Sequence, residues 1–85
     1  MIEIKHVISD ELGLHARPAG QLVKAAAKFK CKVQAGTPEK MVDAKSIIRL
    51  MSLVMKQGSE MTLTFDGEDE EEASKALEAF LNENV

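Results

Sequence analysis

Alternating hydrophobic and polar positions predict four β-strands along this chain. In the first segment, Ile2, Ile4 and Ile8 alternate with charged or polar residues, and His6 falls on the same inward parity. A strand with one buried face shows this two-residue period. The expected strands span residues 2–9, 32–35, 41–43 and 61–66, with a turn at 36–40 between the second and the third.

Three segments between and after these strands have the period of an amphipathic helix. The first spans residues 16–30, and its apolar positions are Ala19, Leu22, Val23, Ala26 and Phe29. The second is a short helix from Ile47 to about Val54, which Ser46 can cap and which residues 56–58 end. The third opens with the capping-box pair Asp69 and Glu72. Its expected buried face consists of Ala73, Ala76, Leu77, Phe80 and Leu81.

The resulting order of elements is βαββαβα. An antiparallel sheet with its helices on one face satisfies this order in two layers, which is an α+β fold. A chain of 85 residues has room for one core, so we expect a single domain over residues 1–85.

Composition and charge reduce the number of possible functions. Residues 1–58 carry ten Lys or Arg and five Asp or Glu, whereas residues 59–85 carry one and nine, so the first part suits acidic partners or phosphate. Three phenylalanines without tyrosine or tryptophan argue against a base-stacking nucleic-acid surface. The lone Cys31 fits a reducing compartment and a structural role. No signal-peptide core and no apolar run of membrane-spanning length is present, so we expect a cytoplasmic protein without membrane insertion.

The strongest chemical signal is the stretch Gly13-Leu14-His15-Ala16-Arg17-Pro18-Ala19-Gly20, where the first helical pattern begins. A proline fits the first turn of a helix, because the N–H that it lacks would have no intrahelical partner there. The free N–H groups and the positive end of the helix dipole then favour an anion. A neutral imidazole is a nucleophile at physiological pH. These features predict that His15 accepts a phosphoryl group and that Arg17 pairs with the phosphate.

A short helix cannot bury Ile47, Ile48 and Met51 together, since they cover more than one of its faces. We therefore expect an exposed apolar patch there and a buried Leu50 and Leu53. The expected partner-binding residues are Ala16, Gly20, Lys24, Ile47, Ile48, Arg49 and Met51. Two histidines without ligand spacing give no support for a metal site, and we expect no cofactor. No second acid, base or nucleophile is placed near His15, which argues against an enzyme with turnover of its own.

The whole chain resembles the HPr family, the histidine-containing phosphocarriers of the bacterial sugar phosphotransferase system. Residues 13–19 look like the active-site signature of the family, and Lys45-Ser46-Ile47-Ile48-Arg49-Leu50-Met51-Ser52-Leu53 looks like its regulatory-serine signature. The resemblance implies an open-faced β-sandwich, with four antiparallel strands and three helices packed on one side. It also implies that Enzyme I phosphorylates His15 on Nδ1 and that the phosphoryl group passes to the A domains of sugar permeases.

The second motif resembles the form found in low-GC Gram-positive bacteria. There the resemblance implies that an HPr kinase/phosphorylase modifies Ser46, and that the phosphoserine form is a corepressor of catabolite control protein A. We expect a monomer. The chain departs from the family pattern at Leu12, where a small polar residue is usual, and at Val54, where glycine usually ends the second helix.

Two other functions fit the same residues. One is an HPr-like regulatory module that keeps Ser46 signalling without a role in sugar uptake, although such paralogues typically lack the histidine that this chain has at position 15. The other is the carrier of a nitrogen-related phosphorelay, in which the reacting residues would look the same.

Overall fold

The structure is a computed structural model that describes residues 1–53 and 55–84. Its order of elements is βαββαβα, as the hydrophobic pattern predicts. The elements are β1 (Ile2–Val7), α1 (Ala16–Ala27), β2 (Lys32–Thr37), β3 (Lys40–Asp43), α2 (Ile47–Met51), β4 (Glu60–Asp66) and α3 (Glu70–Asn84).

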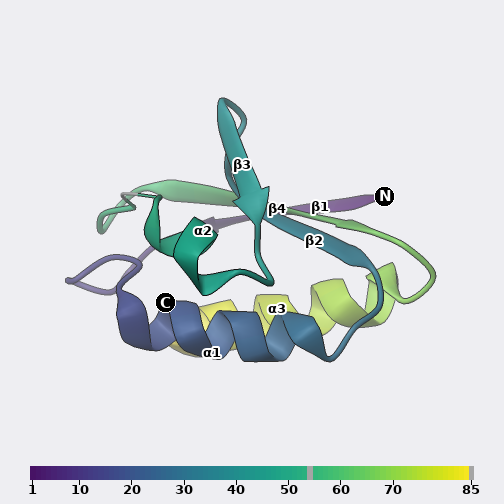
Figure 1. Cartoon of the computed structure of the whole chain (residues 1–85). Coiled ribbons are helices and arrows are strands. Elements are labelled where there is room, and N and C mark those ends of the chain that lie inside the picture. The colour runs from purple at the N-terminus through teal and green to yellow at the C-terminus, as the bar shows by residue number, and fades with distance from the viewer. Residues whose placement is uncertain (54, 85) are drawn as a thin grey trace.

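The four strands form one antiparallel sheet in the order β1-β4-β2-β3. Strand β4 lies between β1 and β2, and it pairs Leu63 with Ile4 on one side and with Ala35 on the other. Strand β3 turns up from the sheet on the side opposite the helices (Figure 1). The expected four-stranded antiparallel sheet is confirmed.

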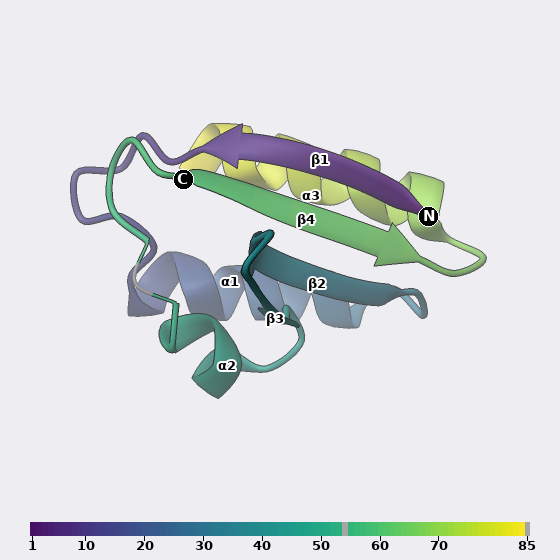
Figure 2. The ribbon, with the colours of Figure 1, turned by 90° about the horizontal axis from the view of Figure 1, so that it is seen from above.

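All three helices lie on one face of the sheet (Figure 1), with α3 under β1 and β4 and α1 under β2 (Figure 2). The core between the two layers is apolar, and Leu22, Leu50, Leu63, Phe65 and Leu77 have no exposed surface. Burial of these side chains supplies the main stabilisation of a domain of this size. Within the described residues, no helix has both the length and the apolar character needed to cross a membrane.

Several element ends differ from the sequence expectation. Helix α1 ends at Ala27 and not at Lys30, and helix α2 ends at Met51. The predicted end of α2 at Val54 lies outside the described residues. The turn between β2 and β3 is shorter than expected, because Gly36, Thr37 and Lys40 all belong to the strands. Tertiary pairing extends both strands beyond the residues that alternate clearly.

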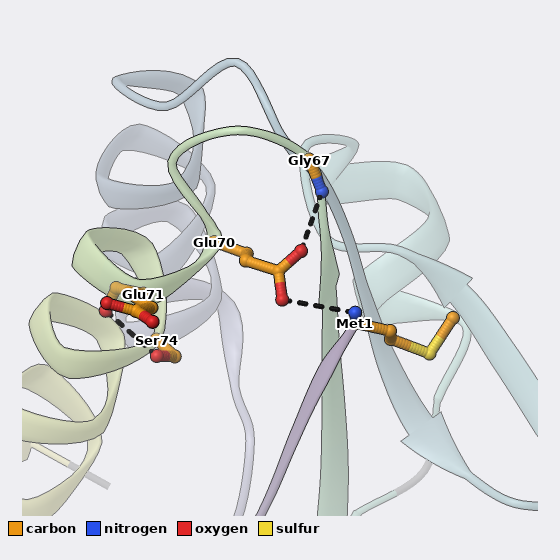
Figure 3. Close-up of polar contacts among 5 residues, drawn as sticks. All are labelled: Met1, Gly67, Glu70, Glu71 and Ser74. Carbon is orange, nitrogen blue, oxygen red and sulfur yellow. Dashed lines mark hydrogen bonds and ion pairs between the residues drawn. The ribbon is translucent and has the colours of Figure 1, made fainter.

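The start of α3 is held differently from the predicted capping box. Asp69 uses both carboxylate oxygens to accept hydrogen bonds from the N–H groups of Lys30 and Cys31. Glu70 instead accepts from the N–H of Gly67 and lies 3.1 Å from the N-terminal amine of Met1 (Figure 3).

The buried face of α3 also differs from the expectation at two positions. Ala76 is exposed, so its assignment to the buried face is wrong. Ser74 is buried, and its hydroxyl donates to the carbonyl oxygen of Glu71 (Figure 3). That bond satisfies the hydroxyl within its own helix, which allows a polar side chain to take a core position.

Candidate functional site

The loop between β1 and α1 is a tight turn that delivers His15. The N–H of Gly13 donates to the carbonyl oxygen of Asp10, and the N–H of Leu12 donates to Oδ1 of the same residue. Gly13 has a φ of 68°, a conformation that glycine adopts without strain. A Cβ at this position would overlap the carbonyl oxygen of Met55, which also accepts from the N–H of Leu14. The turn is therefore pinned against the segment that leads to β4.

His15 is the N-cap residue of α1, with an extended backbone and no capping hydrogen bond from its side chain. Its carbonyl oxygen accepts from the N–H of Ala19, which starts the helical ladder. The N–H groups of Ala16 and Arg17 lie in the first turn, where an α-helix offers no internal acceptor. Pro18 follows them and has no N–H. The start of α1 therefore presents two backbone donors directly after the histidine, as the motif predicts.

An open pocket of about 290 Å³ lies beside this helix start. Its lining residues are Asp10, His15, Arg17, Pro18, Gln21, Glu83 and Asn84. Nε2 of His15 lies 3.5 Å from Oδ2 of Asp10, and the two side chains are 33% and 30% exposed. Arg17 is exposed and forms no ion pair with any described residue. The pocket thus combines a half-buried imidazole, a carboxylate 3.5 Å from one of its nitrogens, and a guanidinium without a described ion-pair partner.

The lining contains residues that the sequence pattern does not connect with His15. Glu83 and Asn84 come from the end of α3, far away in the sequence, and packing of α3 beside α1 brings them to the site. Asp10 is five residues before His15 and reaches it through the turn at Gly13, so the expectation that no second acid lies near His15 is wrong. A polar residue at a strand end is the only sequence signal for Asp10, and many such residues are solvated.

The described residues contain no group of three or more His, Cys, Asp or Glu side chains that could hold a metal ion. Cys31 is buried with a free thiol. Burial, and then a hydrogen bond with Asp69, raises the pKa of that thiol. A thiol that is hard to ionise is a poor nucleophile, which agrees with the structural role expected for this residue.

Ser46 is the N-cap residue of α2. Its Oγ accepts from the N–H of Arg49 at 3.3 Å, and its N–H donates to the carbonyl oxygen of Asp43. The predicted capping role is confirmed. The side chain of Ser46 is partly exposed, at the edge of the α2 surface.

The residues expected to bind partners come from two neighbouring helices. Ala16, Gly20 and Lys24 are spaced by four on α1, so they form one row along that helix. A Cβ at Gly20 would lie 3.5 Å from Cδ1 of Ile47, which places this row beside α2.

The residues from α2 continue this row as an exposed apolar surface. Ile47, Ile48 and Met51 are 42%, 80% and 43% exposed, whereas Leu50 and Leu53 are buried, as expected. Arg49 is exposed as well. The structure thus brings the seven expected partner-binding residues into two adjacent helices.

Of the two departures from the family pattern, Leu12 lies at the tip of the turn before His15 and is 74% exposed. Val54 lies outside the described residues.

Comparison with known proteins identifies the family. Residues 2–83 match the family described as "PTS HPr component phosphorylation site". The phosphocarrier protein HPr of Lysinibacillus sphaericus is 47% identical over 76 residues, which cover 89% of this chain and 86% of that protein. A solved structure of the histidine-containing phosphocarrier protein of Mycoplasma superposes with a TM-score of 0.92 at 35% identity, covering 96% of this chain and 93% of that one.

A further match is the crystal structure of Crh, a catabolite repression protein of Bacillus subtilis, described as a dimer with a swapped domain. It has a TM-score of 0.78 and 42% identity, and the match covers 100% of this chain and 98% of Crh. Sequence, fold and motif agree, and the chain belongs to the HPr family of phosphocarrier proteins of the phosphotransferase system.

Proposed function

We propose that this protein accepts a phosphoryl group from Enzyme I on Nδ1 of His15 and passes it to the A domains of sugar permeases. Membership in the HPr family supports the carrier role. The observation that carries the proposal is the open start of α1. There His15 leaves the N–H groups of Ala16 and Arg17 without a side-chain cap. The guanidinium of Arg17 lines the same pocket and forms no ion pair with any described residue.

In the transfer, the lone pair of Nδ1 attacks phosphorus, and the bond from phosphorus to the donor atom breaks with its electron pair left on the donor. The phosphate oxygens then accept from the N–H groups of Ala16 and Arg17, at the positive end of the α1 dipole. The guanidinium of Arg17 can hold two of these oxygens at once. In the second transfer, a nucleophile of the permease domain attacks phosphorus, and the bond from phosphorus to Nδ1 breaks with its electron pair left on Nδ1. The protein is thus a carrier without turnover of its own.

Labelling with phosphoenolpyruvate and Enzyme I tests this proposal. We expect one phosphoryl group per chain, labile in acid and stable in alkali, as a phosphoramidate is. His15→Ala should abolish the label. A label that persists in His15→Ala, or that survives acid as an ester does, would contradict the carrier role.

The apolar surface of α2 and the row on α1 form the proposed docking surface for Enzyme I and the permease domains. Exposed Ile47, Ile48 and Met51 supply apolar area beside the site, and Lys24 and Arg49 supply positive charge. A partner that approaches with apolar side chains and carboxylates would cover both features and lie close to His15. Ala16 has only a methyl group and Gly20 has no side chain, which lets a partner come near the backbone of α1.

We also propose that an HPr kinase/phosphorylase modifies Ser46 and that the phosphoserine form binds catabolite control protein A. The position supports this, since a dianion at the N-cap of α2 would lie next to Ile47 and Ile48 on the docking surface. Aspartate is also a good N-cap, so Ser46→Asp should leave the free energy of unfolding unchanged or slightly higher. Its added negative charge should slow phosphoryl transfer from Enzyme I. Transfer as fast as in the wild type would show that charge at this position is not a switch.

A regulatory module without sugar flux is the second candidate, because the chain is 42% identical to Crh over its full length. The histidine at position 15 favours a carrier, and the labelling experiment separates the two functions. A carrier in a nitrogen-related relay would be labelled too, but it would not pass the group to sugar permeases.

We further propose that the protein is a cytoplasmic monomer. Sedimentation analysis would separate a monomer from a domain-swapped dimer like that of Crh.

A further inference from the structure

We propose that Asp10 is a positioning residue for His15. In the carrier reaction proposed above, its carboxylate would keep the neutral imidazole protonated at Nε2, so that the lone pair is on Nδ1. Neither the composition nor the two sequence motifs point to Asp10. The inference rests on the 3.5 Å separation between Oδ2 of Asp10 and Nε2 of His15 in the pocket.

The carboxylate of Asp10 is fixed in place by the turn. Its Oδ1 accepts from the N–H of Leu12 at 2.9 Å, and its backbone carbonyl accepts from the N–H of Gly13 at 2.9 Å. One oxygen therefore holds the turn and the other faces the histidine. Both side chains are about one-third exposed, so solvent reaches the pair, and the hydrogen bond from Leu12 limits the orientation of the carboxylate.

The hydrogen-bonding chemistry of the carboxylate and the imidazole determines which ring nitrogen carries the proton. An ionised carboxylate only accepts hydrogen bonds, and a neutral imidazole donates from one nitrogen and accepts at the other. A carboxylate that faces Nε2 therefore favours the tautomer with the proton there. The same arrangement, a histidine oriented through its second nitrogen by a carboxylate, sets the tautomer of catalytic and metal-binding histidines.

This pairing also contributes after the transfer. When the lone pair of Nδ1 forms the bond to phosphorus and the donor keeps the electrons of the broken bond, the proton on Nε2 stays in place. The ring then carries a positive charge, and the carboxylate of Asp10 faces it. An ion pair at a solvent-exposed position changes such an equilibrium by roughly two- to fivefold. Asp10 would thus favour the acceptor tautomer before the transfer and the phosphorylated ring after it.

The substitution that tests this role is Asp10→Asn. The amide oxygen can still accept from the N–H of Leu12, but the other end of the side chain becomes an N–H₂ donor. That donor would face Nε2 and favour the opposite tautomer, with the proton on Nδ1. The matched control is Asp43→Asn, because Oδ1 of Asp43 accepts from the N–H of Lys45 at 2.9 Å in the same two-residue turn. Among the described residues, Asp43 forms no ion pair with either histidine.

The readout is the pair of imidazole nitrogen shifts of His15 in ¹⁵N NMR, measured where the ring is neutral. The other histidine, His6 on β1, serves as the reference. We expect the Nε2–H form in the wild type and in Asp43→Asn, and a shift toward the Nδ1–H form in Asp10→Asn. We also expect phosphoryl transfer by Asp10→Asn to be roughly two- to fivefold weaker, the size of an exposed ion pair.

Two results would overturn the role of Asp10. One is the finding that His15 of the wild-type protein is mainly in the Nδ1–H form. This measurement does not depend on the folding of any variant. The other is an Asp10→Asn protein with the same nitrogen shifts and the same transfer as Asp43→Asn. The NMR measurement needs no Enzyme I. A protein that shows the tautomer shift but takes no label would therefore contradict the carrier function and not the positioning by Asp10.

Discussion

At the start of α1 the side chain of the N-cap residue His15 makes no capping hydrogen bond, whereas at the start of α2 the hydroxyl of Ser46 accepts one from the N–H of Arg49. Both residues have the extended backbone of an N-cap. The start of α1 therefore leaves its first N–H groups open to a ligand. At the start of α2, the side chain of Ser46 already accepts from one of the first N–H groups. The start of α1 thus lacks the capping stability that Ser46 gives to α2, and its donors face the candidate site.

The start of α3 differs from both. Asp69 and Glu70 are occupied by backbone donors from Lys30, Cys31 and Gly67, and Glu70 also pairs with the chain's N-terminal amine (Figure 3). These donors lie outside α3, but the carboxylates of Glu70, Glu71 and Glu72 in its first turn would repel an anion. Among the three described helices, α1 is the one whose start has neither an acidic residue in the first turn nor a side-chain cap.

The largest expected effect concerns the turn that delivers the open start. Gly13→Ala should lower the free energy of unfolding by more than about 2 kcal/mol, because an alanine at positive φ costs about 1–2 kcal/mol and its Cβ would also overlap the carbonyl of Met55. Gly58→Ala is the control, since Gly58 has a φ of 89° but no atom within 4 Å of a Cβ. Equal losses in chemical denaturation would show that the turn is not pinned at Gly13.

The next effect concerns the guanidinium at the open start. Arg17→Lys keeps the charge and loses the planar fork, so phosphoryl transfer should slow by roughly tenfold in at least one direction. His15 should still become labelled. Lys28→Arg at the C-cap of the same helix is the control, because Lys28 is exposed and lies outside the proposed docking surface. Rapid-quench kinetics of Arg17→Lys that match those of the wild type would remove Arg17 from the site.

An exchange of caps tests the comparison itself. Ser46→Ala should lower the free energy of unfolding by about 1 kcal/mol, the usual contribution of an N-cap hydrogen bond. His15→Ser should raise it by up to about 1 kcal/mol, because a hydroxyl at this position can cap donors that the histidine leaves open. Denaturant titration measures both values. A His15→Ser protein less stable than the wild type would mean that the imidazole supports the fold.

The smallest effect lies at the start of α3. Hydrogen bonds from the N–H groups of Lys30 and then Cys31 hold the pKa of Asp69 below its ordinary value near 3.8. A folded-state pKa below the unfolded one contributes stability that is present above the unfolded value and is lost as the pH falls through the folded value. The melting temperature of Asp69→Asn should therefore fall less between pH 5 and about pH 2 than that of the wild type. Asp66→Asn, at an exposed carboxylate, serves as the control.

Much of the fold follows from local patterns in the sequence. Strands β1 and β4 and the buried faces of α1 follow from alternation and helical spacing, because their side chains meet one core. The exposed Ile47, Ile48 and Met51 also follow, since five helical residues cannot bury three faces. The pattern places Ala76 on the buried face of α3, but Ser74 is buried there instead. A polar residue is not expected in the core from its type alone, and Ser74 is tolerated because its hydroxyl donates to the carbonyl oxygen of Glu71 in the same helix.

The candidate site could be predicted only in part. His15, Arg17 and Ser46 lie in local motifs whose chemistry depends on a helix start. Asp10 and Glu83 reach the pocket through a pinned turn and through the packing of α3 beside α1, and neither contact has a local signature. The sequence thus predicts the residues proposed to react, and not the pocket residues that the turn and the helix packing bring beside them.

The most direct test of the open helix start is a ¹H–¹⁵N NMR spectrum recorded before and after phosphorylation by Enzyme I and phosphoenolpyruvate. If the phosphate on His15 is held by the first turn of α1, the amide protons of Ala16 and Arg17 should shift strongly downfield and exchange more slowly with water. The amides of Ile47 and Ile48, at the capped start of α2, should change little. A phosphorylated protein in which the amides of Ala16 and Arg17 do not move would contradict the account.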